Sequence, residues 1–174
     1  MASIRSCELP KAALLRRYQE GGAYADCYVT EVAGSVSHSA FVEAFYTTPL
    51  FKVERAILGV FAARPSTDFD VRQLATAASN SFAAWRVEGR SQDQLLLADL
   101  TGRTRSWLMV APVGDGADSR THLYFGSAVV PKTNAKTGTR EMGFAFHALL
   151  GFHRAYSRAL LRAARSRLLE HRGA

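Results

Sequence analysis

Residues 151–170, GFHRAYSRALLRAARSRLLE, decide the fold of this chain, because they predict a long helix with two unlike sides. A projection at roughly 100° per residue separates an alanine-rich side from a ridge of arginines. The small residues would let a sheet approach closely, so we expect a C-terminal helix over residues 150–170 that is covered on its apolar side. That side is predicted to hold Ala155, Ala159, Phe152, Ala163, Tyr156, Leu160, His153 and Ala164.

The segment before this helix predicts a meander of antiparallel strands. From Phe82 onward, apolar residues recur at every second position and turn-forming residues follow at short intervals. We expect strands at residues 83–89, 94–100, 104–112, 119–130 and 140–149. In the last of them, Met142, Phe144 and Phe146 would share the inner face.

The first half of the chain predicts one strand and several short helices. Residues 24–32, YADCYVTEV, have the β-branched and aromatic content of a strand. Helical patterns cover residues 9–20, inside an N-terminal helical extension over residues 1–22, and residues 39–46, 49–61 and 68–79. Together these elements predict an α+β fold in which a curved antiparallel sheet wraps around the C-terminal helix, with residues 1–174 as a single domain.

Four short motifs resemble those of a bacterial family of uncharacterised function with helix-grip architecture. They are Leu9-Pro10, Asp26-Cys27-Tyr28-Val29, Trp85-Arg86-Val87 and Phe152-His153-Arg154. The helix-grip fold, also that of START and plant-allergen proteins, implies an apolar cavity between sheet and helix. Members of the family occur alone or joined to a short-chain-dehydrogenase-like domain. This chain has no Gly-rich βαβ unit, and Gly151 stands where members tend to have proline.

Charge and cysteine content narrow the class of protein. The net charge is +7, and the segment from residue 154 onward contains six arginines and only one acidic residue, Glu170. The excess of positive charge is therefore a property of the C-terminal helix, and a nucleic-acid partner is not expected. Two cysteines, Cys7 and Cys27, are expected to be reduced thiols. We expect no metal, no cofactor, no signal peptide and no membrane span, and hence a cytoplasmic protein.

Aromatic residues are numerous enough to line a pocket between sheet and helix. The same side chains could instead fill the core and leave no space for a ligand. The candidate lining residues are Tyr28, Trp85, Trp107, Phe125, Phe144, Phe146, Phe152, His153 and Tyr156.

Three polar features could carry chemistry. His153 on the apolar side of the helix would either bind a ligand head group or hydrogen-bond backbone carbonyls. Asp26 lies in an apolar strand, but no general base can be paired with it from sequence alone. His122 and His147 would be cross-strand neighbours only if the register of a hairpin allowed it.

The arginine ridge, defined as Arg154, Arg158, Arg162 and Arg165, could bind an anion or an acidic partner, or could be a solvated face.

The sequence leaves three hypotheses for the function of the chain. The first is a domain that binds a small apolar molecule between sheet and helix. The second is a cyclase, dehydratase or isomerase in the same cavity. The third is an interaction module that uses the arginine ridge or an apolar strand edge to bind a protein or nucleic acid, or to form a homodimer.

Overall fold

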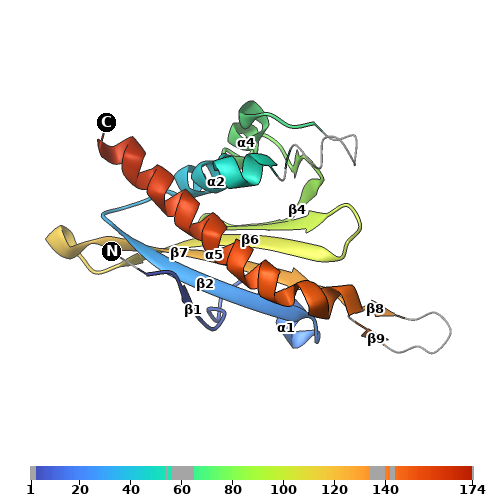
Figure 1. Ribbon diagram of the computed structural model, residues 1–174. Coiled ribbons are helices and arrows are strands. Elements are labelled where there is room, and N and C mark those ends of the chain that lie inside the picture. The colour runs from blue at the N-terminus through green and yellow to red at the C-terminus, as the bar shows by residue number, and fades with distance from the viewer. Residues whose placement is uncertain (1–2, 54, 56–64, 134–139, 142–143, 174) are drawn as a thin grey trace.

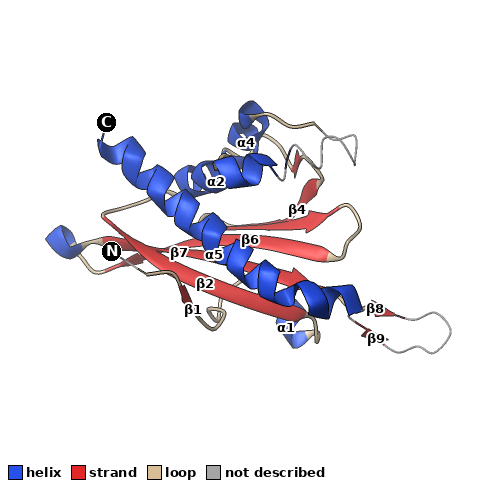
Figure 2. Ribbon diagram, in the orientation of Figure 1, coloured by secondary structure: helices blue, strands red, loops and turns tan. Residues whose placement is uncertain are grey.

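The computed structural model describes residues 3–53, 55, 65–133, 140–141 and 144–173. Seven strands form one antiparallel sheet in the order β1-β2-β7-β6-β5-β4-β3. The long C-terminal helix α5 lies across one face of this sheet, the shorter helix α2 lies beside α5, and α4 lies next to α2 (Figure 1). The chain is thus an α+β fold with a layer of helices on an antiparallel sheet (Figure 2).

The strands follow the predicted meander closely up to residue 129. The sheet consists of β1 (Arg5–Ser6), β2 (Tyr24–Ala33), β3 (Ser81–Phe82), β4 (Trp85–Arg90), β5 (Gln94–Asp99), β6 (Thr104–Val113) and β7 (Arg120–Val129). The N-terminal strand β2 pairs with β7, so that Asp26 lies opposite Ser127. This pairing places β2 beside the meander and leaves its other side to the short strand β1.

The helices are α1 (Arg16–Glu20), α2 (His38–Tyr46), α4 (Asp68–Ala75) and α5 (Phe144–Gly173), with a 3₁₀ turn at Gly116–Asp118. Residues 49–53 are helical too, and the Thr48 hydroxyl accepts the backbone N–H of Phe51, as its predicted N-cap role requires. The rest of the helix predicted over residues 49–61 lies mostly outside the described residues. In place of a helix over residues 9–20, the chain makes turns before α1 because Leu9, Ala13 and Leu15 pack onto the sheet.

The strand predicted over residues 140–149 is wrong. Among the described residues of this stretch, which omit 142–143, only the two-residue strand β9 (Arg140–Glu141) is extended, paired with β8 (Lys132–Thr133), and α5 begins at Phe144. The alternation of Phe144 and Phe146 therefore does not mark a strand face. Gly151, expected at the start of the helix, lies well inside it.

The inward side of helix α5 overlaps only in part with the one predicted: Leu160 and Ala164 are buried as expected. Phe152, Ala155 and Ala159 are exposed, and the predicted inward face is rotated toward the leucines. Leucine burial stabilises a core more than alanine burial, so the larger side chains take the inward positions. The buried residues of this helix are Ser157, Leu160, Leu161, Ala164 and Leu168.

Two apolar layers hold the sheet, one on each face. On the helix side, Phe45, Phe125 and Leu108 belong to a core shared with α5 and α2. On the other face, the N-terminal segment packs Leu9, Ala13 and Leu15 against Leu96 and Trp107.

Gly126 of β7 lies beneath this second layer. A Cβ at Gly126 would come within 2.9 Å of Leu15 and Trp107 side chains and of the Asp26 carbonyl, so only glycine fits.

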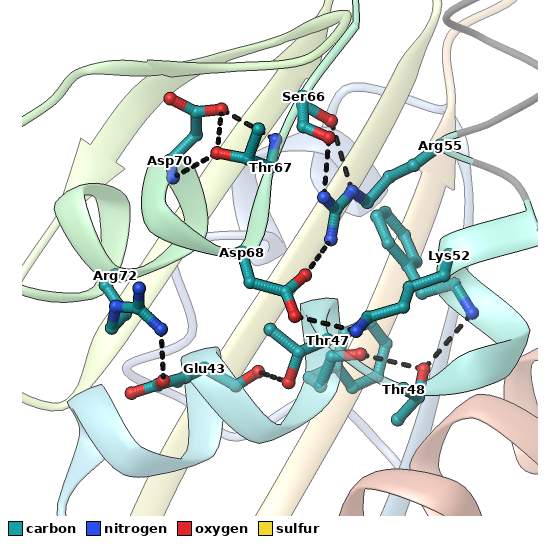
Figure 3. A network of polar contacts seen from close by, with 12 residues as sticks. Glu43, Thr47, Thr48, Lys52, Arg55, Ser66, Thr67, Asp68, Asp70 and Arg72 are labelled. Carbon is teal, nitrogen blue, oxygen red and sulfur yellow. Dashed lines mark hydrogen bonds and ion pairs between the residues drawn. The ribbon is translucent and has the colours of Figure 1, made fainter.

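A polar network ties the helix at residues 49–53 to the start of α4 (Figure 3). The Arg55 guanidinium, only 7% exposed, donates to Asp68 Oδ1 at 2.7 Å and to the Ser66 carbonyl at 2.6 Å. Lys52 Nζ lies 2.6 Å from the other oxygen of Asp68. Because the buried guanidinium is paired, this cluster fixes the position of α4 against the layer of helices.

Candidate functional site

A hollow of about 390 Å³ lies at the edge of β2, between the chain segment that follows β1 and the first half of α5. Residues 24–26 of β2 extend beyond the positions at which β1 and Cys7 pair with it, so this stretch of strand edge is open to other groups. The hollow is lined by Ser6, Cys7, Glu8, Leu9, Gln19, Tyr24, Ala25, Asp26, Cys27, Tyr28, Arg154 and Arg158.

A buried polar cluster joins β2, β7 and α5 beside this hollow. Asp26 Oδ1 accepts hydrogen bonds from the Ser127 hydroxyl at 2.7 Å and from the Ser127 backbone N–H at 3.2 Å. His153 Nε2 lies 2.7 Å from the same hydroxyl and 3.3 Å from Asp26 Oδ2. Tyr24 and Tyr28 also donate their hydroxyls to Asp26 Oδ2, at 3.2 and 3.4 Å.

This environment keeps Asp26 ionised. Burial by itself raises the pKa of the Asp26 carboxyl, but hydrogen bonds from His153 and Ser127 outweigh it and bring the pKa below its ordinary value. Burial, with the negative charge of Asp26 nearby, raises the pKa of Tyr28 to about 12. The tyrosine therefore remains a hydrogen-bond donor across the physiological range.

The cluster does not have the geometry of a nucleophilic triad. In a triad, the acid and the nucleophile contact different nitrogens of the histidine, whereas Ser127 and Asp26 both approach Nε2 of His153. The Ser127 hydroxyl is also buried and shared with the carboxylate. What the cluster can do is hold a proton between His153 and Asp26, with the imidazole partly exposed.

Three of the four ridge arginines contact β2, and two of these, Arg154 and Arg158, are also exposed. Arg154 Nε is 3.4 Å from the Tyr24 hydroxyl, and the Arg158 guanidinium lies over the Tyr28 ring, 5.4 Å from its centroid. Arg165 donates to the Glu31 carbonyl at 3.0 Å. Arg162 is exposed. The ridge therefore divides into two arginines that line the hollow and two that do not.

The predicted cavity-lining residues do not gather in one place. Tyr28 and Phe125 are buried in the core on the helix side, and Trp85 and Tyr156 pack at its margin. Trp107 lies on the opposite face of the sheet, under the N-terminal segment, so it cannot line a space next to α5. Phe152 is 69% exposed and stacks on Tyr156, which excludes it from the core. The side chains of Phe144 and Phe146 lie outside the described part of the structure.

Sequence reasoning singled out Asp26 and His153 separately and did not pair them. The contact depends on the register of β2 against β7 and on the rotation of α5, which no local pattern encodes. Ser127 and Tyr24 were not predicted. Alternation along the strand does predict that Tyr24, Asp26 and Tyr28 share one face, but it does not predict that this face meets Ser127 and His153.

The proposed pairing of His122 with His147 fails because residues 144–149 are helical. His122 instead lies opposite Glu31 in the sheet, with Nε2 3.6 Å from that carboxylate. The His147 side chain is outside the described part. Among the described residues, no three side chains of the metal-binding types come together, and none of the described helices is long and apolar enough to cross a bilayer.

The chain matches no known protein family and no curated protein. Among solved structures, it is similar to an uncharacterised protein from Rhizobium leguminosarum, with 9% identity, a TM-score of 0.34 and coverage of 85% of this chain and 97% of that one. It is also similar to CalU16 from Micromonospora echinospora, with 11% identity, a TM-score of 0.31 and coverage of 98% and 94%. Scores this low do not place the chain in the fold family of either protein.

Proposed function

We propose that the chain binds a small molecule with an anionic group in the hollow at the edge of β2. The observation that carries this proposal is that two arginines, Arg154 and Arg158, line the same hollow as Tyr24 and Tyr28. Arginine and tyrosine together favour an acidic group attached to an aromatic or apolar body. A volume of about 390 Å³ is within the range of small-molecule sites.

The hollow also holds the carboxylates of Asp26 and Glu8, and both repel an anion. The oxygens of Asp26 already accept hydrogen bonds, so we expect an anionic group on the α5 side of the hollow, at Arg154 and Arg158. Ser127 donates to one oxygen, and the tyrosine hydroxyls and His153 surround the other. The carboxylate therefore orients the tyrosines, and the arginines remain the groups that a ligand would meet.

In this proposal the fold is a single helix-grip domain, with α5 held against a curved sheet. The antiparallel order of the strands and the position of α5 across one face support it. An apolar ligand inside the grip has less support than one at the β2 edge. Tyr28, Phe45 and Phe125 pack against Leu160 there, although two buried hydroxyls, Thr30 Oγ1 and Ser157 Oγ, lack partners among the described residues.

Titration with 8-anilinonaphthalene-1-sulfonate, an aromatic sulfonate whose fluorescence rises in apolar sites, tests the proposal. We expect Arg158→Gln to weaken binding about tenfold, and Arg154→Gln/Arg158→Gln to weaken it further, because each loses a charged hydrogen bond. Arg162→Gln is the matched control, since it removes the same charge one helical turn away and outside the hollow.

Equal affinities for Arg158→Gln and Arg162→Gln would contradict the proposal. Unchanged far-ultraviolet circular dichroism in each variant shows that the dye reports on the folded protein and not on a loosened core.

Acid–base chemistry on the bound molecule is a second candidate function. It is favoured by the 3.3 Å contact between His153 Nε2 and Asp26 Oδ2, because the carboxylate holds in place an imidazole, a group that can give or take a proton. If an acidic molecule is extracted from the purified protein, His153→Gln should still bind that molecule but should no longer convert it. Conversion at the wild-type rate by that variant would remove the candidate.

A further inference from the structure

The two cysteines of the chain, Cys7 and Cys27, are 20 residues apart in the sequence and meet at the hollow. β1 pairs with β2 so that Ser6 lies opposite Tyr28, and the next pair in this register is Cys7 and Cys27. The Cys7 backbone N–H donates to the Cys27 carbonyl at 3.0 Å, which continues the pairing one residue beyond the strand. The two Sγ atoms are 3.2 Å apart, and both thiols are free.

The two thiols differ in access. Cys7 is half-buried and lines the hollow of about 390 Å³, as well as a more open one of about 540 Å³ on the far side of the segment. Cys27 is only 2% exposed and packs in the apolar layer under the N-terminal segment. A reagent in solution therefore reaches Cys7 first, and Cys27 reaches only Cys7.

The environment favours the same order of reaction. A hydrogen bond from the Cys27 thiol lowers the pKa of Cys7, burial opposes this, and the positive charge of Arg5 lowers it further. The pKa of Cys27 is raised by the same contact and by burial. Cys7 is thus the attacking thiolate and Cys27 the resolving thiol.

We propose that Cys7 and Cys27 are a reversible dithiol–disulfide pair that reacts with low-molecular-weight disulfides such as oxidised glutathione. The Cys7 thiolate attacks one sulfur of oxidised glutathione and releases one glutathione thiolate, which leaves a mixed disulfide on Cys7. Cys27 then attacks Cys7 Sγ, and the second glutathione leaves. The two protein thiols are oxidised, oxidised glutathione is reduced to two thiols, and the two protons of the cysteines pass to them.

The disulfide would tie the N-terminal segment to the sheet. Closing the bond requires the sulfurs to move from 3.2 Å to about 2.0 Å apart, a small shift for the half-buried Cys7 side. Residues 9–15 lie inside the loop that the bond closes, and they cover Trp107 and Leu96. Oxidation would therefore hold this cover in place and raise the melting temperature by roughly 5 °C or more. This inference stands independently of the proposed ligand.

The test is incubation of the full chain in its native state with oxidised and reduced glutathione at a series of ratios, followed by alkylation and intact-mass measurement. We expect the wild type to lose about 2 Da and to take up no alkylating agent, with a cross-linked peptide that contains residues 7 and 27. Dithiothreitol should restore both thiols. Two alkylated thiols at every ratio, or dimers joined between chains, would overturn the proposal.

Single variants test the order of attack. Cys27→Ala should accumulate a mixed disulfide of Cys7 with one glutathione, because no resolving thiol remains. Cys7→Ser should leave Cys27 unmodified, because the buried thiol is out of reach. Rapid glutathione uptake by Cys27 in Cys7→Ser would overturn the assigned order. Should Cys27→Ala fail to fold, the cross-linked peptide of the wild type still decides whether the pair exists.

Discussion

Trp107→Ala is expected to lower the free energy of unfolding by about 3–5 kcal/mol. The indole is fully buried on the face of the sheet opposite to α5, and its Nε1–H donates to Gln94 Oε1 at 2.9 Å. Gln94 in turn bonds Leu14 and Ala12 of the N-terminal segment. The substitution removes a large side chain from a packed layer and loosens the segment that covers it. Urea denaturation followed by circular dichroism measures the loss.

The same variant separates the two faces of the sheet. Under conditions in which it is folded, Trp107→Ala should bind the aromatic sulfonate as the wild type does, because Trp107 does not line the hollow. Trp107→Phe is the matched control, since it keeps an aromatic ring and loses only part of the side-chain volume. Its free energy of unfolding should lie between those of the wild type and Trp107→Ala. A loss below about 1 kcal/mol for Trp107→Ala would contradict this placement of the side chain.

Stability should fall by about 2 kcal/mol between pH 7.5 and pH 5 because of His38. Burial lowers the pKa of His38 from 6.5 to about 4. The positive charge of Arg90 also lowers the pKa, whereas a backbone hydrogen bond and the negative charge of Asp93 raise it. The unfolded chain therefore binds a proton near pH 6.5 that the folded chain does not. This contribution is complete above about pH 6.5 and is lost as the pH falls toward 4.

His38→Gln provides the comparison for this pH dependence. The variant removes the titrating group, so the difference in its stability between the two pH values should be smaller by about the same 2 kcal/mol. The lowered pKa of Asp26 affects stability only below about pH 4, outside this window. Equal pH dependence in wild type and variant would show that His38 is not buried as a neutral imidazole.

Much of the sheet could be predicted because alternation and turn composition are local properties. Residues 94–99 and 104–113 repeat an apolar pattern between clear turns, and the strands lie within a residue of where the pattern predicts them. The short helix α2 was predictable for a similar reason, because its apolar residues recur at helical spacing.

The beginning of α5 could not be read in the same way. Residues 144–149, FAFHAL, fit a strand by alternation and a helix by composition, so the sequence alone does not decide between the two. In the structure, the seven residues before Gly151 are helical. The alanine-rich side of α5 was predicted to face inward because small residues let a sheet approach closely. In the structure leucines take most of the buried positions instead, because burying a leucine side chain stabilises the fold more than burying an alanine.

The candidate site depends on contacts between distant segments. Asp26 and Ser127 are 101 residues apart and meet only through the register of β2 and β7. Cys7 and Cys27 meet through the two-residue strand β1, which is too short to give a pattern. The sequence shows which polar side chains are present, but only the fold shows which of them come into contact.

Native mass spectrometry of the protein purified from its cells tests the central claim most directly. A small acidic molecule bound at one equivalent to the wild type and to Arg162→Gln, but absent from Arg154→Gln/Arg158→Gln, is the result that this account predicts. Denaturing extraction would then identify it. Equal occupancy in all three proteins would contradict a ligand site in the hollow at the edge of β2.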